Sequence, residues 1–230
     1  FDRAISEADV VVVATPTQYA EQLMIDVLDR VGESVAVTDV ASVKGNIYRR
    51  LVQHYGALPR NAVLGHPIAG SEKSGVDAAF ADLYVDRRVI LIADSANDTK
   101  LAAKVCALWE AVGAEVDFMT PDKHDEVLAL TSHLPHFLAY ALVAQLSEGD
   151  NADEALRYAG GGFRDFTRIA ASDPRMWREI FLANKTQLLS SIDSFQQMVE
   201  VFEQALRSED GDALESLFAQ SKSLRDQFKF

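Results

Sequence analysis

The sequence predicts an α/β domain with a mainly parallel sheet, followed by an all-α domain. Short apolar runs alternate with segments of helical spacing through the first half of the chain. From Pro121 onward no strand candidate remains, and helical patterns continue to the last residues. Continuous apolar strands separated by helices are typical of a parallel sheet that helices cover on both faces. We therefore expect one domain in residues 1–120 and a second, helical domain in residues 121–230.

The expected strands are apolar runs, mostly rich in β-branched residues, as buried strands usually are. They lie at Val10–Ala14, Val35–Val40, Ala62–Gly65, Val89–Ile92 and Glu115–Phe118. The segments between them place apolar residues three and four positions apart, which is the helical period. These segments predict helices at Tyr19–Val31, Lys44–Tyr55 and Thr99–Val112.

The second half contains helical patterns at Asp122–Thr131, Pro135–Leu146, Asp153–Tyr158, Pro174–Arg207 and Asp212–Phe228. The long fourth pattern carries large apolar residues at steps of three and four between Phe181 and Leu206, which predicts a helix-packing seam. This seam fits either an internal core stripe or a subunit interface. The glycines at 160–162 interrupt the helical run, and no strand precedes them as a phosphate-binding loop requires.

Composition excludes several classes of function. The 230 residues carry a formal net charge of −13, whereas nucleic-acid and anionic-membrane surfaces require a basic footprint. Cys106 is the only cysteine, so we expect neither an internal disulfide nor a cysteine-based metal cluster. The histidines match no zinc-binding spacing, and we expect no metal. No apolar run approaches about 18 residues and no signal peptide opens the chain, so we expect a cytoplasmic protein without membrane contact.

A polar segment with the sequence HPIAGSEKSG begins at His66, directly after the third predicted strand. In open α/β sheets, ligands bind beyond the carboxyl ends of the strands. The segment therefore places a titratable histidine, hydroxyl groups and charges where chemistry commonly occurs. A solvated polar loop beside a strand-terminal histidine is the alternative.

Two other predicted strands also end in polar residues. Thr15, Pro16 and Thr17 follow the first strand, and Ser42 follows the second. Their hydroxyl groups are suited to cap the helices that come next. In a dinucleotide-binding sheet the same positions face the cofactor and the crevice, so both roles stay open.

The helical half contains a pair of histidines in the sequence SHLPH. His133 and His136 are three residues apart and therefore share a face of a helix. Pro135 between them marks a helix start or a kink.

Arginines occur in the glycine- and aromatic-rich segment that starts at Gly160. Arg168 is suited to clamp an anion, because a guanidinium is always charged and binds carboxylates through two parallel hydrogen bonds. Pairing with Asp165 or Asp173 on a helix surface is the alternative.

Four blocks, HPIAGSEKSG, DVASVKG, SHLPH and GGGFRDFTRIAASDPRMW, together resemble the prephenate dehydrogenase family, which includes cyclohexadienyl and arogenate dehydrogenases. The resemblance extends from Ala8 to Asn184. It implies a Rossmann-type dinucleotide-binding domain followed by an all-α helical dimerisation domain. The family's G-x-G-x-x-G turn is absent, so we expect the first domain to be N-terminally truncated and the chain to be an incomplete view of a longer protein.

The resemblance implies oxidative decarboxylation of prephenate to 4-hydroxyphenylpyruvate, a step of tyrosine biosynthesis. It also implies NAD as cofactor, with NADP left open, arogenate as a possible second substrate, and a homodimer. Two rival interpretations are another β-hydroxyacid-type dehydrogenase and a catalytically silent module that binds aromatic ligands.

The resemblance also implies roles for individual residues. His66 matches the catalytic histidine that accepts a hydrogen bond from the substrate hydroxyl, and Ser42 matches a serine beside both groups. Arg168 matches the arginine that holds a substrate carboxylate, with Asp165 expected to orient it.

The remaining matches lie in the substrate pocket and near the cofactor. His133 and His136 match substrate-pocket positions and compete with His66 as proton acceptor. Glu72 matches a carboxylate that gates the pocket mouth, and a neutral Ser71 favours prephenate over arogenate. Thr15 and Pro16, with Ser42, are expected to face the cofactor.

Overall fold

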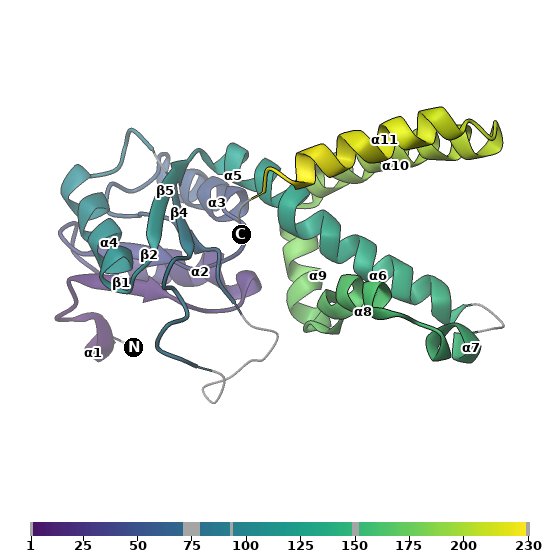
Figure 1. The fold of residues 1–230 in the computed structure, drawn as a ribbon. Helices are drawn as coiled ribbons and strands as arrows, with labels where there is room; N and C mark the ends of the chain where they lie inside the picture. The colour runs from purple at the N-terminus through teal and green to yellow at the C-terminus, as the bar shows by residue number, and fades with distance from the viewer. Residues whose placement is uncertain (1, 71–78, 93, 149–151, 229–230) are drawn as a thin grey trace. The chain divides into compact units, whose positions relative to one another are not determined.

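The computed structural model describes residues 2–70, 79–92, 94–148 and 152–228 (Figure 1). These residues divide into two compact units, 1–188 and 189–230. The first unit holds every strand described below and the helices through α9. The second holds most of α10 and all of α11.

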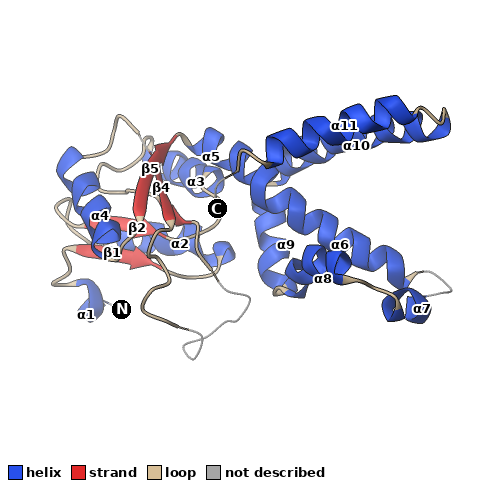
Figure 2. Ribbon diagram, in the orientation of Figure 1, coloured by secondary structure: helices blue, strands red, loops and turns tan. Residues whose placement is uncertain are grey.

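The strands are β1 (Val10–Val13), β2 (Ala36–Asp39), β3 (Gly65–Pro67), β4 (Arg88–Ile92) and β5 (Glu115–Met119), drawn in red in Figure 2. β1 pairs with β2 and β4 pairs with β5, both in parallel. β3 pairs with β4 in the antiparallel direction, with His66 opposite Ile90. A parallel bridge between Val37 and Ala62 connects the two groups of strands. The predicted mainly parallel sheet is confirmed, with β3 as the exception.

The third strand differs from its expected position. Ala62 forms only a single bridge with β2, and the regular ladder starts at Gly65. The N–H of Gly65 donates to the Asp39 carboxylate at 3.1 Å instead of to a backbone carbonyl of β2. A side chain therefore takes over the pairing at this point, which no periodicity in the sequence indicates.

Helices cover both faces of the sheet, as predicted. α2 (Thr17–Leu28) and α3 (Gly45–Tyr55) pack on the face that includes Val37 and Leu64. α4 (Thr99–Ala111) packs on the face that includes Ala36 and Val63. Alternate residues of one strand thus enter opposite cores, which is the period of a strand. A short helix, α1 (Asp2–Ile5), precedes β1 and was not expected.

A continuous helical segment carries the histidines of the second half. It consists of α5 (Pro121–Leu128), a π-helical turn η2 (Ala129–His133) and α6 (Leu134–Ser147). Pro135 lies in the first turn of α6, but the backbone before it is already helical, so the expectation of two separate helices over 122–131 and 135–146 is wrong. By length and composition alone, 121–147 is apolar enough to cross a membrane. It also carries His124 and Asp125, both buried, and a core helix passes the same test.

The remaining helices are α7 (Ala152–Arg157), α8 (Gly161–Thr167), the 3₁₀ turn η3 (Arg168–Ala171), α9 (Pro174–Ala183), α10 (Lys185–Arg207) and α11 (Gly211–Arg225). The expectation of one helix over 174–207 is wrong, because the backbone leaves helical geometry at Asn184. The predicted interruption of the helical run at the triple glycine is confirmed, since α7 ends at Arg157 and α8 begins at Gly161 with Gly160 as its N-cap. In the second unit, α10 and α11 form a hairpin (Figure 1). The rings of Phe202 and Phe218 lie 5.8 Å apart between centroids.

Candidate active site

A cleft of about 590 Å³ opens in the first unit beside β3. Its described walls bring together four predicted site residues, Ser42, His66, His133 and His136. The rest of the lining is mainly apolar and includes Leu128, Ile169, Met176, Trp177 and Ile180. Apolar walls with a few convergent polar groups are typical of small-molecule sites.

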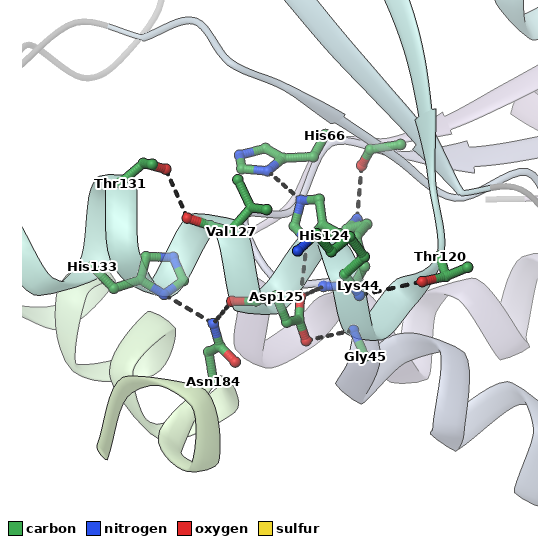
Figure 3. A network of polar contacts seen from close by, with 12 residues as sticks. Lys44, Gly45, His66, Thr120, His124, Asp125, Val127, Thr131, His133 and Asn184 are labelled. Carbon is green, nitrogen blue, oxygen red and sulfur yellow. Dashed lines mark hydrogen bonds and ion pairs between the residues drawn. The ribbon is translucent and has the colours of Figure 1, made fainter. Parts of the chain in front are cut away.

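His66 is the middle residue of β3 and is linked to two residues of α5. Its Nδ1 lies 2.8 Å from Nε2 of His124, and Nδ1 of His124 lies 2.8 Å from Oδ1 of Asp125 (Figure 3). A carboxylate only accepts hydrogen bonds, so His124 carries its proton on Nδ1 and accepts on Nε2. His66 must then donate from Nδ1. Its Nε2 is left as an acceptor.

Electrostatics keep these imidazoles neutral. Burial lowers the pKa of His66 well below its usual value, and His124 and Lys44 lower it further. Burial also lowers the pKa of His124, although Asp125 opposes the shift. At neutral pH each ring therefore carries one proton, and the hydrogen-bond chain fixes where that proton sits.

A buried ion pair holds the backbone next to His66. Lys44 and Asp39 are both fully buried and form a salt bridge. Lys44 Nζ donates to the carbonyl of Gly65 at 2.7 Å, and Asp39 Oδ1 accepts from the N–H of Gly65 at 3.1 Å. A Cβ atom at Gly65 would lie 3.0 Å from the carbonyl oxygen of Asp39, so a side chain at this position would press against the backbone of β2. The DVASVKG motif thus positions the residue that precedes His66.

Asp125 also caps α3. Its carboxylate accepts from the N–H groups of Lys44 and Gly45, each at 2.9 Å. A Cβ atom at Gly45 would lie 2.5 Å from Oδ2 of Asp125, so a larger residue at this position would displace the carboxylate. The expectation that Ser42 caps α3 is wrong, because Lys44 occupies the N-cap position. The capping carboxylate belongs to Asp125 on α5. Ser42 instead lines the cleft.

The helical wall of the cleft, formed by η2, α6 and α9, carries His133 and His136, whose hydrogen-bond partners differ from those of His66. His133 Nδ1 lies 3.1 Å from Nδ2 of Asn184, which also donates to the carbonyl of Asp125 at 2.8 Å (Figure 3). His136 Nδ1 donates to the carbonyl of Ser132 at 2.8 Å, and its ring stacks on Trp177 with centroids 3.5 Å apart. Burial lowers the pKa of His133 to about 4 and also lowers that of His136.

Thr15 and Pro16 follow β1 at its carboxyl end. Neither Thr15 nor Thr17 caps α2, since Pro16 is the N-cap and no side chain caps it. The Oγ1 of Thr15 is buried and has no hydrogen-bond partner among the described residues. A buried polar atom of this kind calls for a partner. The position thus fits the edge of a cofactor site, where a polar group of a nucleotide would satisfy the hydroxyl.

The other predicted binding residues lie outside the described lining. Arg168 begins η3 and is exposed, whereas Ile169 beside it lines the cleft. Asp165 is exposed and pairs with Arg164 at 3.2 Å. Ser71 and Glu72 lie outside the residues that the structure describes.

Sequence reasoning missed Trp177 in the cleft lining and four residues behind it, namely Lys44, His124, Asp125 and Asn184. One signal was available for two of them. His124 and Asp125 stand side by side in the first turns of a helix that Thr120 and Pro121 open. A buried acid beside a histidine is a frequent arrangement at sites of proton transfer.

Known protein families match nearly the whole chain. Residues 2–118 match the nucleotide-binding domain of prephenate dehydrogenase, and residues 120–220 match the dimerization domain of the same family. A cyclohexadienyl dehydrogenase of Zymomonas mobilis is 36% identical over 225 residues, which cover 96% of this chain and 76% of that protein. A prephenate dehydrogenase of Bacillus subtilis is 35% identical, and the match covers 98% of this chain but 61% of that protein.

Solved structures agree with these matches. Prephenate dehydrogenase from Aquifex aeolicus, in complex with hydroxyphenyl propionate and NAD+, is 37% identical with a TM-score of 0.85 over 95% of this chain and 76% of that chain. Arogenate dehydrogenase from Synechocystis is 26% identical with a TM-score of 0.86 over 100% of this chain and 82% of that chain.

Proposed function

This chain belongs to the prephenate dehydrogenase family, and we propose that its histidine-lined cleft binds prephenate with His66 as the base of the reaction. The family consists of NAD-dependent oxidoreductases that convert prephenate by oxidative decarboxylation in tyrosine biosynthesis. The family, the two-domain fold and NAD as cofactor, all predicted from the sequence, are confirmed.

The reaction needs a base at the substrate hydroxyl. NAD, when bound, accepts the hydride that leaves the ring carbon bearing that hydroxyl. The hydroxyl proton moves to Nε2 of His66 as the carbonyl forms. The bond to the ring carboxylate then breaks with loss of carbon dioxide, and its electron pair makes the ring aromatic and leaves the former carbonyl oxygen as a phenolate. His66 returns its proton to that oxygen, which gives the phenol of the product. A neutral imidazole with an unprotonated Nε2 is the group that the first proton transfer requires.

The chain from Asp125 through His124 to His66, with its two contacts of 2.8 Å, is the observation that carries this assignment. It orients the ring and keeps the proton of the resting base on Nδ1. When His66 takes a second proton, its Nδ1–H still donates to Nε2 of His124, and Nδ1–H of His124 donates to the carboxylate of Asp125. The same logic operates where a buried aspartate orients a catalytic histidine.

The other roles follow from position in or beside the cleft. We infer that Ser42 orients the substrate hydroxyl and the nicotinamide, and that His133 and His136 bind polar groups of the substrate. Arg168 holds a carboxylate, and Thr15 and Pro16 contact the cofactor. Support comes from the cleft lining, from the unsatisfied Thr15 hydroxyl and from the family motifs.

Further proposals rest on sequence motifs and composition. Glu72 gates the pocket mouth, and Ser71 favours prephenate over arogenate. Asp165 orients Arg168 once a substrate carboxylate is present. The dinucleotide-binding domain covers residues 1–120, and the helical domain, residues 121–230, forms a homodimer. The net charge of −13 argues against nucleic acid as a partner, and the cytoplasm is the proposed location.

Arogenate is the second candidate substrate, because the Synechocystis structure similar to this chain is described as an arogenate dehydrogenase. The discriminating measurement is the ratio of kcat/KM for prephenate and arogenate in the full-length protein. A ratio in favour of arogenate would reverse the assignment.

The base assignment is tested by two variants of His124 in the full-length protein. His124→Phe removes the acceptor that faces Nδ1 of His66, and we expect kcat to fall by about 10- to 100-fold. His124→Gln keeps an acceptor oxygen there and should recover most of the loss. Activity is measured as NADH formed from prephenate and NAD+, with 4-hydroxyphenylpyruvate identified as product.

Each outcome of this assay decides between the interpretations. Normal turnover in His124→Phe would show that the relay does not serve the base. Turnover of other β-hydroxy acids in place of prephenate would favour the rival dehydrogenase class. Binding of aromatic ligands without any turnover would favour the silent module.

Arg168→Lys tests the carboxylate clamp. Lysine keeps the charge and loses the two-pronged hydrogen bond, so we expect KM for prephenate to rise about tenfold with little change in kcat. Arg164→Lys, four residues away on the neighbouring helix, is the control and should leave KM unchanged. An unchanged KM in Arg168→Lys would assign Arg168 to structure alone.

A further inference from the structure

Asn184, the residue at which α9 ends, controls one corner of the cleft without lining it. Its side chain is 3% exposed, and its Nδ2 is within hydrogen-bond distance of two acceptor positions. One is the carbonyl of Asp125 at 2.8 Å, and the other is Nδ1 of His133 at 3.1 Å. An amide nitrogen has two hydrogens, and these two partners use both of them.

The orientation of this amide is fixed by the backbone. A carbonyl oxygen only accepts, so a flipped Asn184 would place two oxygen atoms against each other at Asp125. Nδ2 must therefore face both partners. Because an amide nitrogen only donates, Nδ1 of His133 must be the acceptor, and the proton of the neutral ring sits on Nε2.

His133 is thereby opposite in polarity to the other two histidines of the cleft. His66 donates from Nδ1 to His124, and His136 donates from Nδ1 to the carbonyl of Ser132. Both rings keep an Nε2 that accepts. His133 alone among these three carries an Nε2 that donates, so an oxygen atom without a proton is its complementary partner.

We propose that Asn184 is a specificity-determining positioning residue, whose amide holds His133 as a hydrogen-bond donor to a carboxylate or carbonyl oxygen of the substrate. This inference rests on the proposed function, because prephenate supplies oxygens of both kinds. The contacts with Asp125 and His133 connect the end of α9 to α5 and η2. Asn184, which ends α9, thus also sets whether His133 donates or accepts in the cleft.

The first test needs no substrate. In the full-length protein labelled with ¹⁵N-histidine, the ring nitrogens of His133 report which one is protonated. We expect protonation at Nε2 in the natural chain and at Nδ1 in Asn184→Asp, because a carboxylate facing Nδ1 must accept. His133 protonated at Nδ1 in the natural chain would overturn the inference and would leave the assignment of His66 intact.

The second test is a double-mutant cycle on KM for prephenate. Asn184→Ala frees the tautomer of His133, and we expect KM to rise about tenfold with kcat within about threefold of the natural value. His133→Gln supplies an amide donor at the position of Nε2 that does not depend on Asn184. In that background Asn184→Ala should leave KM unchanged.

Thermal unfolding of each variant separates this role from a structural one. A merely structural Asn184 would raise KM equally in both backgrounds, and that result would overturn the proposal. If the natural protein did not turn over prephenate, the proposed function would fail while the tautomer measurement would still decide the state of His133.

Discussion

Two buried histidines face the same cleft, and the groups behind them differ. A histidine and then a carboxylate stand behind His66, whereas the neutral amide of Asn184 stands behind His133. A carboxylate at the end of the chain stabilises a positive charge on the ring that faces the substrate. An amide offers no such charge, so His133 is held as a neutral donor. We therefore expect identical side chains to take opposite tasks that depend on the residue behind them.

Asp125 takes part in both arrangements. Its side chain accepts from His124 and caps α3, and its backbone carbonyl accepts from Asn184. One residue of α5 therefore connects the hydrogen-bond chain of His66 on the sheet with that of His133 on the helices. We expect substitutions around His66 on the sheet to lower kcat, and substitutions around His133 on the helices to raise KM.

The largest expected effect is on His66. His66→Asn in the full-length protein should lose about 10²- to 10⁴-fold in kcat while NAD+ still binds, because general-base assistance is removed. The comparison predicts that His133→Asn and His136→Asn raise KM more than they lower kcat. Near-normal turnover in His66→Asn, with loss in either of the other variants, would assign the base to the helical wall.

The pH profile gives the same variant a second readout. The base works only when neutral, so activity is full above the pKa of His66 and falls as the pH drops through it. Because burial, His124 and Lys44 lower that pKa, the acid limb of kcat/KM should lie below pH 6.5. This limb should persist in His133→Gln and vanish in His66→Asn.

The buried ion pair beside His66 should control stability. Lys44→Met leaves Asp39 charged, buried and unpaired, which costs about 3–5 kcal/mol in the free energy of unfolding. The double variant Lys44→Met with Asp39→Leu removes both charges and should be closer to the natural protein. Urea unfolding measures both. Equal stability of Lys44→Met and the natural protein would show that the pair does not clamp Gly65.

The helical wall should make stability depend on pH. His133 has a pKa of about 4 in the folded protein against 6.5 unfolded, so the folded state binds fewer protons between these values. Its contribution is full above pH 6.5 and is lost as the pH falls to about 4, amounting to about 3 kcal/mol. His133→Gln should flatten this part of the profile in urea unfolding. An unchanged slope would assign the pH dependence to the other buried histidines.

Sequence periodicity predicted most of the fold, and it failed where a side chain replaced a backbone partner. Strands β1, β2, β4 and β5 lie within about one residue of their predicted bounds, because continuous apolar runs leave few alternatives. The third strand was misplaced since the Asp39 carboxylate binds Gly65. One helix was predicted over 174–207 because no local pattern marks a break at Asn184. The tertiary contact of Asn184 with Asp125 accompanies the break and is visible only in the folded chain.

The cleft lining was more predictable than its support. Ser42 and His66 follow predicted strands, and His133 and His136 share a predicted helix face. All four line one cleft, although His66 lies within β3 and not after a strand. Their catalytic and binding roles stay predictions. The supporting contacts connect residues far apart in sequence, such as His66 with His124 and Lys44 with Asp125. No local pattern encodes these distances, so only the folded chain shows them.

The smallest expected effect concerns Ser42, which lines the cleft with His66 and does not occupy the N-cap position of α3. If its hydroxyl orients the substrate hydroxyl toward Nε2 of His66, Ser42→Ala removes one hydrogen bond and should lower kcat about fivefold, the effect of about 1 kcal/mol. Ser42→Thr keeps the hydroxyl and should retain more activity. The acid limb set by His66 should stay in place in both variants, because Ser42 does not titrate. A loss in kcat as large as that of His66→Asn would instead make Ser42 part of the proton-accepting group. His66 would then not be the sole base on the sheet side of the cleft.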